Sequence, residues 1–102
     1  MATALPSIFH MHLVSDSTGE TLSAIAKAAT VQYPMVRPTE HMHPLVRTQR
    51  QLKRVLSEIE KEPGIVLYTV VNKSLASELE AHCKGLKIPC LAVLQPIMQV
   101  FE

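Results

Sequence analysis

Two hydrophobic patterns alternate along this chain, and together they predict its secondary structure. Continuous runs at 8–15, 65–71 and 88–94 are apolar on both strand faces, apart from two histidines in the first run, which is typical of a parallel sheet covered on both sides. Between these runs, apolar residues recur every three or four positions, the spacing of an amphipathic helix. The segment 35–46 is the least regular, and its polar run at 39–43, flanked by Pro38 and Pro44, is predicted to be a further strand at the sheet edge.

The first two predicted helices each begin with a capping-box pattern. Ser17-Thr18-Gly19-Glu20 matches Ser-x-x-Glu, and Thr48-Gln49-Arg50-Gln51 matches Thr-x-x-Gln. Pro34 is expected to end the first helix, and Pro63-Gly64 the second. The predicted apolar faces hold Leu22, Ile25, Ala26, Ala29 and Tyr33 in the first helix, Leu52, Val55, Leu56 and Ile59 in the second, and Leu75, Leu79, Cys83 and Leu86 in the third.

Strands that alternate with helices predict a three-layer α/β fold. Right-handed crossovers would give a four-stranded parallel sheet in the order 2-1-3-4 with helices on both faces, as in flavodoxin-like and Rossmann-like domains. Ligands of such sheets bind at the carboxyl ends of the first and third strands, here between Asp16–Glu20 and Asn72-Lys73-Ser74. We expect a flexible lead-in at 1–7, one domain at 8–96, and the start of a connection to a further domain at 97–102.

Composition narrows the class of protein without identifying it. The 102 residues are 47% hydrophobic and 19% charged, which fits one folded domain. A net charge of +1 argues against a nucleic-acid partner, and no apolar run approaches the ~20 residues of a membrane span. No secretory signal is visible, so we expect a cytoplasmic protein in which Cys83 and Cys90 are free thiols.

The loop Asp16-Ser17-Thr18-Gly19-Glu20 is the main candidate site. A loop that enters a helix offers free amides and a positive dipole end to an anion, and Gly19 permits close approach. One carboxylate ~5 Å from a phosphate charge, however, costs about 3 kcal/mol at an effective dielectric constant near 20, whereas the helix terminus returns roughly 0.3–2 kcal/mol. A bare flavin phosphate is therefore disfavoured.

Three interpretations of this loop stay open at this point. In the first, Ser17 and Glu20 cap the helix while Asp16 bonds nearby amides. In the second, Lys73 or a metal ion neutralises the carboxylates and a phosphate group binds beside them. In the third, the acidic and hydroxyl groups of the loop meet another domain or protein.

The second predicted helix carries a basic stripe, Arg47, Arg50 and Arg54, on the side opposite its apolar face. Such a stripe is either a solvated surface or a docking surface for an acidic partner or a phosphate, because arginine forks suit both.

Histidines form a weaker candidate. His10 and His12 share a strand face, and so do His41 and His43, so pairing of the two strands would bring four imidazoles together. No cysteine or carboxylate spacing accompanies them, and histidines hydrogen-bonded on a sheet face are the favoured interpretation. We therefore predict no metal site.

The run HLVSDSTGETL at His12–Leu22, followed by an alanine-rich helix ending in Gln32-Tyr33, resembles the N-terminal end of the bacterial pyruvate, phosphate dikinase regulatory proteins. The Val14–Thr21 signature (VSDSTGET) is the specific part of the likeness, which continues through Arg37, the helix after Arg47 and the IVLYTVV strand. Relatives within this family regulate phosphoenolpyruvate synthase.

The resemblance implies the N-terminal domain of a bifunctional enzyme. That enzyme would phosphorylate a threonine of pyruvate, phosphate dikinase using ADP (or ATP), and would remove the phosphate by phosphorolysis with inorganic phosphate. Its nucleotide loop and catalytic residues would lie beyond Glu102, so this chain is expected to hold no catalytic residue or cofactor and to be inactive alone. The implied partners are the dikinase or phosphoenolpyruvate synthase and the chain's own C-terminal domain, and a homodimer is compatible with the sequence.

The residues by themselves also support two other functions. One is a stand-alone flavodoxin-like module that binds a phosphate-bearing small molecule through the Asp16–Glu20 loop. The other is a protein-interaction domain that uses the arginine stripe.

Overall fold

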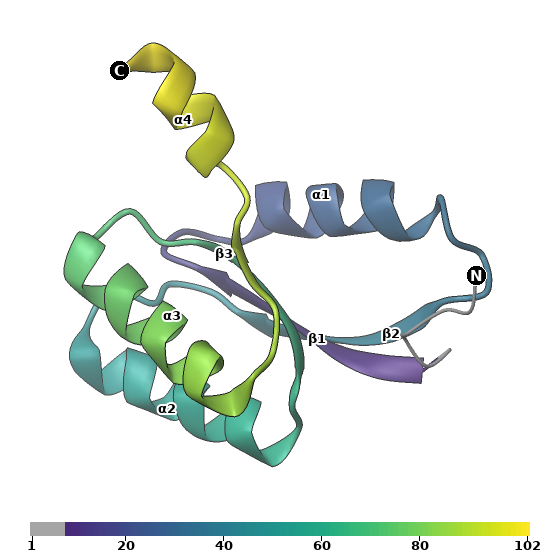
Figure 1. Cartoon of the computed structure of the whole chain (residues 1–102), viewed down its shortest axis with the longest axis horizontal. Helices are drawn as coiled ribbons and strands as arrows, with labels where there is room; N and C mark the ends of the chain where they lie inside the picture. Colours follow the sequence, from purple (N-terminus) through teal and green to yellow (C-terminus); the bar gives the residue numbers. More distant parts are fainter. Residues whose placement is uncertain (1–7) are drawn as a thin grey trace.

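Strands and helices alternate along the whole of residues 8–102, the part of the chain that this computed structural model describes (Figure 1). The predicted lead-in at 1–7 lies outside the described residues. The elements are β1 (Ile8–Ser15), α1 (Glu20–Thr30), β2 (Arg37–His43), α2 (Gln49–Lys61), β3 (Gly64–Thr69), α3 (Lys73–Leu86), β4 (Cys90–Ala92) and α4 (Gln95–Phe101).

The sheet has the predicted topology. All three strand pairs are parallel and the spatial order is β2-β1-β3-β4. Figure 1 shows α1 on one side of the sheet and α2 with α3 on the other, so the three-layer α/β fold is confirmed. The polar strand β2 lies at the edge of the sheet. Its proline has no amide hydrogen to donate, which an edge strand tolerates better than a central strand.

The two faces of the sheet are covered unequally. On one face, Met11 and Leu13 of β1 pack with Leu22 and Ala26 of α1 into a small buried cluster. Val14 points to the opposite face, where α2, β3 and α3 build a larger core. The buried members of that larger core are Val14, Val46, Leu52, Val55, Leu56, Ile59, Val66, Tyr68, Val70, Leu75, Leu79 and Cys83.

Helix α1 is shorter than the sequence pattern predicts. It ends at Thr30 rather than at Pro34, because the amides of Gln32 and Tyr33 turn back to carbonyl groups three residues earlier and close the helix in tight turns. Ala29 and Tyr33, assigned to the apolar face, are exposed. The packing of α1 on the sheet therefore depends on its first two turns.

The capping box predicted at Ser17 is wrong. Gly19 is the N-cap residue, with a left-handed φ of 88°, and no side chain caps the helix. The hydroxyl group of Ser15 accepts the Ser17 amide at 3.0 Å, which folds Ser17 into a turn of the loop. Glu20 is the first residue of α1, and its side chain does not cap the helix.

The capping box that begins α2 is confirmed. The Thr48 hydroxyl accepts the Gln51 amide at 3.2 Å, and the Gln51 side chain accepts the Thr48 amide at 3.0 Å. We expect Thr48→Ala to lower the free energy of unfolding by about 1 kcal/mol, because it leaves helix amides without a partner. Urea denaturation measures this loss, and Gln49→Ala, at an exposed position just inside α2, is the control. Equal stability of the two variants would contradict the capping role.

The C-terminal elements differ most from the sequence pattern. The fourth strand, predicted to be buried over 88–94, covers only Cys90–Ala92, and Leu91 is 55% exposed because β4 is an edge strand. Gln95 and Pro96 begin α4. No residue of α4 is buried, and the helix projects from the sheet (Figure 1).

Cys83, which is buried, and Cys90, which is half-buried, are free thiols, as expected. Among residues 8–102, no helix combines the length and the apolar character that crossing a bilayer requires.

Candidate functional site

The Asp16–Glu20 loop is tied to both neighbouring connections by its first residue. The Asp16 carboxylate accepts the Val71 amide at 3.0 Å, just beyond β3. The Asp16 carbonyl oxygen accepts Arg47 Nε at 2.8 Å from the segment before α2. Asp16 therefore bonds a nearby amide, as the first interpretation of the loop expects, and joins β1 to the exits of β2 and β3.

The rest of the loop divides into one buried residue and three exposed ones. Gly19 is buried against Met42 of β2. Ser17, Thr18 and Glu20 are exposed. Their two hydroxyl groups and one carboxylate at the N-terminus of α1 are thus available to a partner, as the third interpretation requires.

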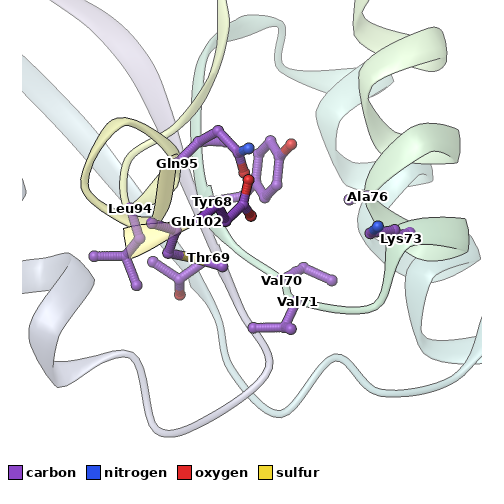
Figure 2. A pocket seen from close by; sticks show the side chains of 11 residues that line it. Tyr68, Thr69, Val70, Val71, Lys73, Ala76, Leu94, Gln95 and Glu102 are labelled. Carbon is purple, nitrogen blue, oxygen red and sulfur yellow. The ribbon is translucent and has the colours of Figure 1, made fainter. Parts of the chain in front are cut away.

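A pocket of about 310 Å³ lies at the carboxyl end of β3 (Figure 2). Lys73 lines it, but none of residues 16–20 does, so the structure places Lys73 and the loop around different parts of this end of the sheet. The predicted crevice lay between the first and third strands, whereas this pocket lies between β3, α3 and the segment that runs from β4 into α4. Its lining residues are Tyr68, Thr69, Val70, Val71, Lys73, Ala76, Ala92, Leu94, Gln95, Met98 and Glu102.

The pocket has polar groups of both charges on an apolar wall. Figure 2 shows Gln95 and Glu102 close to the ring of Tyr68, with Lys73 on the other side. The Tyr68 hydroxyl group donates to the carboxylate of Glu80, and burial together with this bond raises the pKa of Tyr68. The volume lies at the lower end of the range of small-molecule sites, roughly 300–1,000 Å³. The pocket is therefore suited to a small polar group or to a side chain from another domain.

A second cluster lies under the carboxyl end of α2, where four histidines meet. His12 faces His41 in the β1–β2 register, and their rings stack with centroids 4.6 Å apart. His10 Nδ1 lies 2.9 Å from His41 Nε2, and His12 Nδ1 lies 3.0 Å from His43 Nε2. The carboxylate of Glu62 lies 3.6 Å from His10 Nε2 and 3.8 Å from His41 Nε2. The convergence expected from strand pairing is thus observed, and a carboxylate joins it.

The inner pair of this cluster is held in one hydrogen-bonding pattern. His12 is fully buried, and its Nε2 donates to the Glu62 carbonyl group at 2.8 Å. Burial lowers the pKa of His12, and burial with the nearby imidazole of His12 lowers the pKa of His43 to about 4. Both rings are therefore neutral at pH 7, and His12 Nδ1 accepts from His43 Nε2. These two hydrogen bonds, from His43 to His12 and from His12 to the Glu62 carbonyl group, fix the backbone position of Glu62.

The arginine stripe does not act as one surface. Arg47 is engaged with the Asp16 carbonyl group. Arg54 is exposed and lines a shallow hollow with His43 and Glu58. Arg50 is exposed and makes no side-chain hydrogen bond or ion pair with residues 8–102. Arg50 and Arg54 remain the members that a partner can reach.

Sequence reasoning missed two parts of these sites. Gln95 and Met98 of α4 and the following residue Glu102 line the pocket, and the apolar residues of this segment gave no sign of facing β3. Glu62 enters the histidine cluster from the end of α2. A carboxylate directly before the Pro63-Gly64 stop was the available signal, but its distance in sequence from the histidines hid the contact.

The fold and these sites together define a class: a doubly wound parallel α/β domain with a pocket at the carboxyl ends of its strands. A family model described as kinase/pyrophosphorylase matches residues 11–102. Because this match spans most of the chain, the chain belongs to the kinase/pyrophosphorylase family.

Three relatives of this chain share one name. A pyruvate, phosphate dikinase regulatory protein of Bradyrhizobium diazoefficiens is 58% identical over 94 residues, which cover 92% of this chain and 34% of the relative. A protein of the same name from Nitrobacter hamburgensis is 54% identical over 102 residues, covering all of this chain and 36% of the relative. One from a Chelativorans species is 50% identical over 96 residues, which cover 94% and 35%. The chain thus spans about a third of the length of the curated relatives that it matches.

Proposed function

We propose that this chain is the N-terminal domain of a bifunctional regulator of pyruvate, phosphate dikinase. The whole protein would phosphorylate a threonine of the dikinase using ADP (or ATP) and would remove that phosphate by phosphorolysis with inorganic phosphate. Phosphoenolpyruvate synthase is the other candidate target. The site of action is the cytoplasm, and the domain by itself is inactive.

The match of residues 11–102 to the kinase/pyrophosphorylase family carries this proposal. The names of the relatives support a regulatory role directed at the dikinase. The chain spans about a third of their length, which supports placing the catalytic residues of the family outside it. Three glycines, at 19, 64 and 85, cannot supply a Gly-x-x-x-x-Gly-Lys-Ser/Thr loop, which supports placing the nucleotide site in a C-terminal catalytic domain.

In this proposal, the carboxyl end of the sheet faces the rest of the protein. The exposed groups of Ser17, Thr18 and Glu20 and the pocket beside Lys73 would meet a ligand or the C-terminal domain, and residues 97–102 would begin the connection to it. The apolar side chains of α4 support such a contact, because Val100 and Phe101 are 80% and 81% exposed. The free basic groups of Arg50 and Arg54 would dock the dikinase.

A chimera tests the domain assignment. This chain replaces the matching third of the Bradyrhizobium diazoefficiens relative, and phosphate transfer to and from the dikinase is measured with ADP and with inorganic phosphate. We expect activity in the parent relative and in the chimera, and none in the 102-residue chain. Turnover by the chain alone would contradict the placement of catalysis, and a folded but inactive chimera beside an active parent would contradict the domain assignment.

The same chimera tests the docking surface. Reversing two charges in the variant Arg50→Glu/Arg54→Glu should raise KM for the dikinase and weaken its salt dependence while kcat stays unchanged, because rim charges steer association. Lys53→Glu on the same helix changes the net charge without changing the stripe. An unchanged KM in the double variant would remove this face from the proposal.

A further inference from the structure

The histidine cluster at the edge of the sheet has no part in the proposed phosphate transfer. We propose that His10, His41 and Glu62 form a binding site for one divalent transition-metal ion, with Zn²⁺ as the best fit.

The geometry is close to that of a coordinated ion. One ligand atom from each of the three residues lies within 4.8 Å of the other two. The carboxylate oxygens of Glu62 are 3.6 Å from His10 Nε2 and 3.8 Å from His41 Nε2. Zinc–nitrogen and zinc–oxygen bonds of about 2.0–2.2 Å in a tetrahedron separate neighbouring ligand atoms by roughly 3.3–3.6 Å. Rotation of the three side chains closes the site, and the ion then replaces the contact between His10 Nδ1 and His41 Nε2.

The donor set selects the class of ion. Two imidazoles and one carboxylate suit Zn²⁺ and its first-row neighbours, whereas Mg²⁺ and Ca²⁺ prefer oxygen ligands throughout. The carboxylate of Glu62 argues against an anion as the natural occupant. The side chains of His10, His41 and Glu62 are 34%, 23% and 45% exposed, so an ion can enter from solvent and a water molecule can complete its coordination.

The surroundings hold the three ligands in place. The ring of His12 stacks on His41 at an interplanar angle of 16°, which limits rotation of that imidazole. The same ring binds the Glu62 carbonyl group at 2.8 Å and so anchors the residue that supplies the carboxylate. Partners of this kind orient metal ligands in known sites. His12 is thus a positioning residue rather than a ligand.

A histidine elsewhere in the chain provides a matched control. His82 of α3 has Nε2 at 2.7 Å from a carboxylate oxygen of Glu60, without the alignment of a hydrogen bond. It offers the same two chemical groups but lacks a second imidazole. Substitution of His82 therefore tests whether metal binding requires the three residues His10, His41 and Glu62, or whether a single histidine–carboxylate pair is enough.

The test is a titration of the 102-residue chain, freed of any histidine tag and of metal, with Zn²⁺ in a calorimeter. We expect one saturable equivalent. His41→Ala should weaken binding at least about 100-fold and Glu62→Gln at least about tenfold, because each removes one ligand. His82→Ala should bind as the unmodified chain does. Visible absorption of the Co²⁺ complex then reports whether the coordination is tetrahedral.

Glu62→Gln keeps the side-chain volume and the carbonyl group that His12 binds, so it decides the question if His41→Ala does not fold. Circular dichroism in the presence of a chelator establishes folding of each variant. Absence of saturable Zn²⁺ binding would overturn the proposal. So would an affinity unchanged in Glu62→Gln, or one lost in His82→Ala.

Discussion

Gly64→Ala is expected to lower the free energy of unfolding by about 3 kcal/mol or more, the largest loss that we anticipate for a single methyl group in this chain. Gly64 begins β3 directly opposite His10 of β1. A Cβ atom at this position would lie 2.7 Å from the carbonyl carbon of His10 and 3.0 Å from its Cβ. The obstacle is backbone of a central strand, which cannot move without breaking the β1–β3 ladder.

A second glycine serves as the control. Gly85 lies in α3, where a Cβ would meet nothing within 4 Å. Gly85→Ala should therefore raise stability by roughly 0.5–1 kcal/mol through the lower entropy of the unfolded chain and better helix propensity. Urea denaturation of both variants measures the two changes in the free energy of unfolding, provided that its dependence on urea concentration is the same in each variant. Similar values for the two substitutions would show that β1 and β3 do not approach as closely as described.

The architecture was predictable because its signals are redundant. Strands buried on both faces leave continuous apolar runs, and each run is followed by a helix that fits a right-handed crossover. The edge position of β2 follows from its polar side chains and from Pro38. At the start of α2, the Gln51 side chain accepts the Arg47 amide as well as the Thr48 amide, and both bonds of the capping box still form, so the local pattern and the structure agree.

Local patterns failed where another group competed for the same atoms. Ser17 has the right spacing from Glu20 for a capping box, but the buried hydroxyl group of Ser15 takes the Ser17 amide first. Tyr33 has helical spacing from Ala29, yet α1 ends at Thr30 and both side chains are exposed. The run at 88–94 is apolar enough for a buried strand, but only a few of its residues pair with β3, and α4 begins directly after it.

Of the candidate sites, only the residues whose positions follow from strand pairing could be predicted. The spacing of the two histidine pairs and the pairing of β1 with β2 suffice to bring four imidazoles together. Glu62 and the α4 side chains around the pocket come from segments whose direction depends on tertiary packing, which no periodicity encodes. Lys73 was placed correctly at the carboxyl end of the sheet, but the strand beside it in the pocket is β4 rather than β1.

Gly19→Ala is the second large effect that we expect, a loss of about 2–4 kcal/mol, and it bears on the loop of the family signature. Gly19 has a φ of +88°, a region in which a residue with a Cβ is strained by roughly 1–3 kcal/mol. The added Cβ would also lie 2.6 Å from the sulfur and 3.0 Å from the terminal methyl group of Met42. Backbone strain is the larger of the two costs, because these atoms are the far end of a flexible side chain that can move aside.

A double-mutant cycle separates these two costs. In the background of Met42→Ala the close contact is absent, so Gly19→Ala should lose only the part due to backbone strain, about 1–3 kcal/mol. Thr18→Ala, at the exposed neighbouring position, should change stability by no more than about 0.5 kcal/mol. An equal loss from Gly19→Ala in both backgrounds would mean that Met42 does not pack on the loop. A loss that vanished in the Met42→Ala background would mean instead that the left-handed conformation carries no strain, and that side-chain contact alone requires glycine at the start of α1.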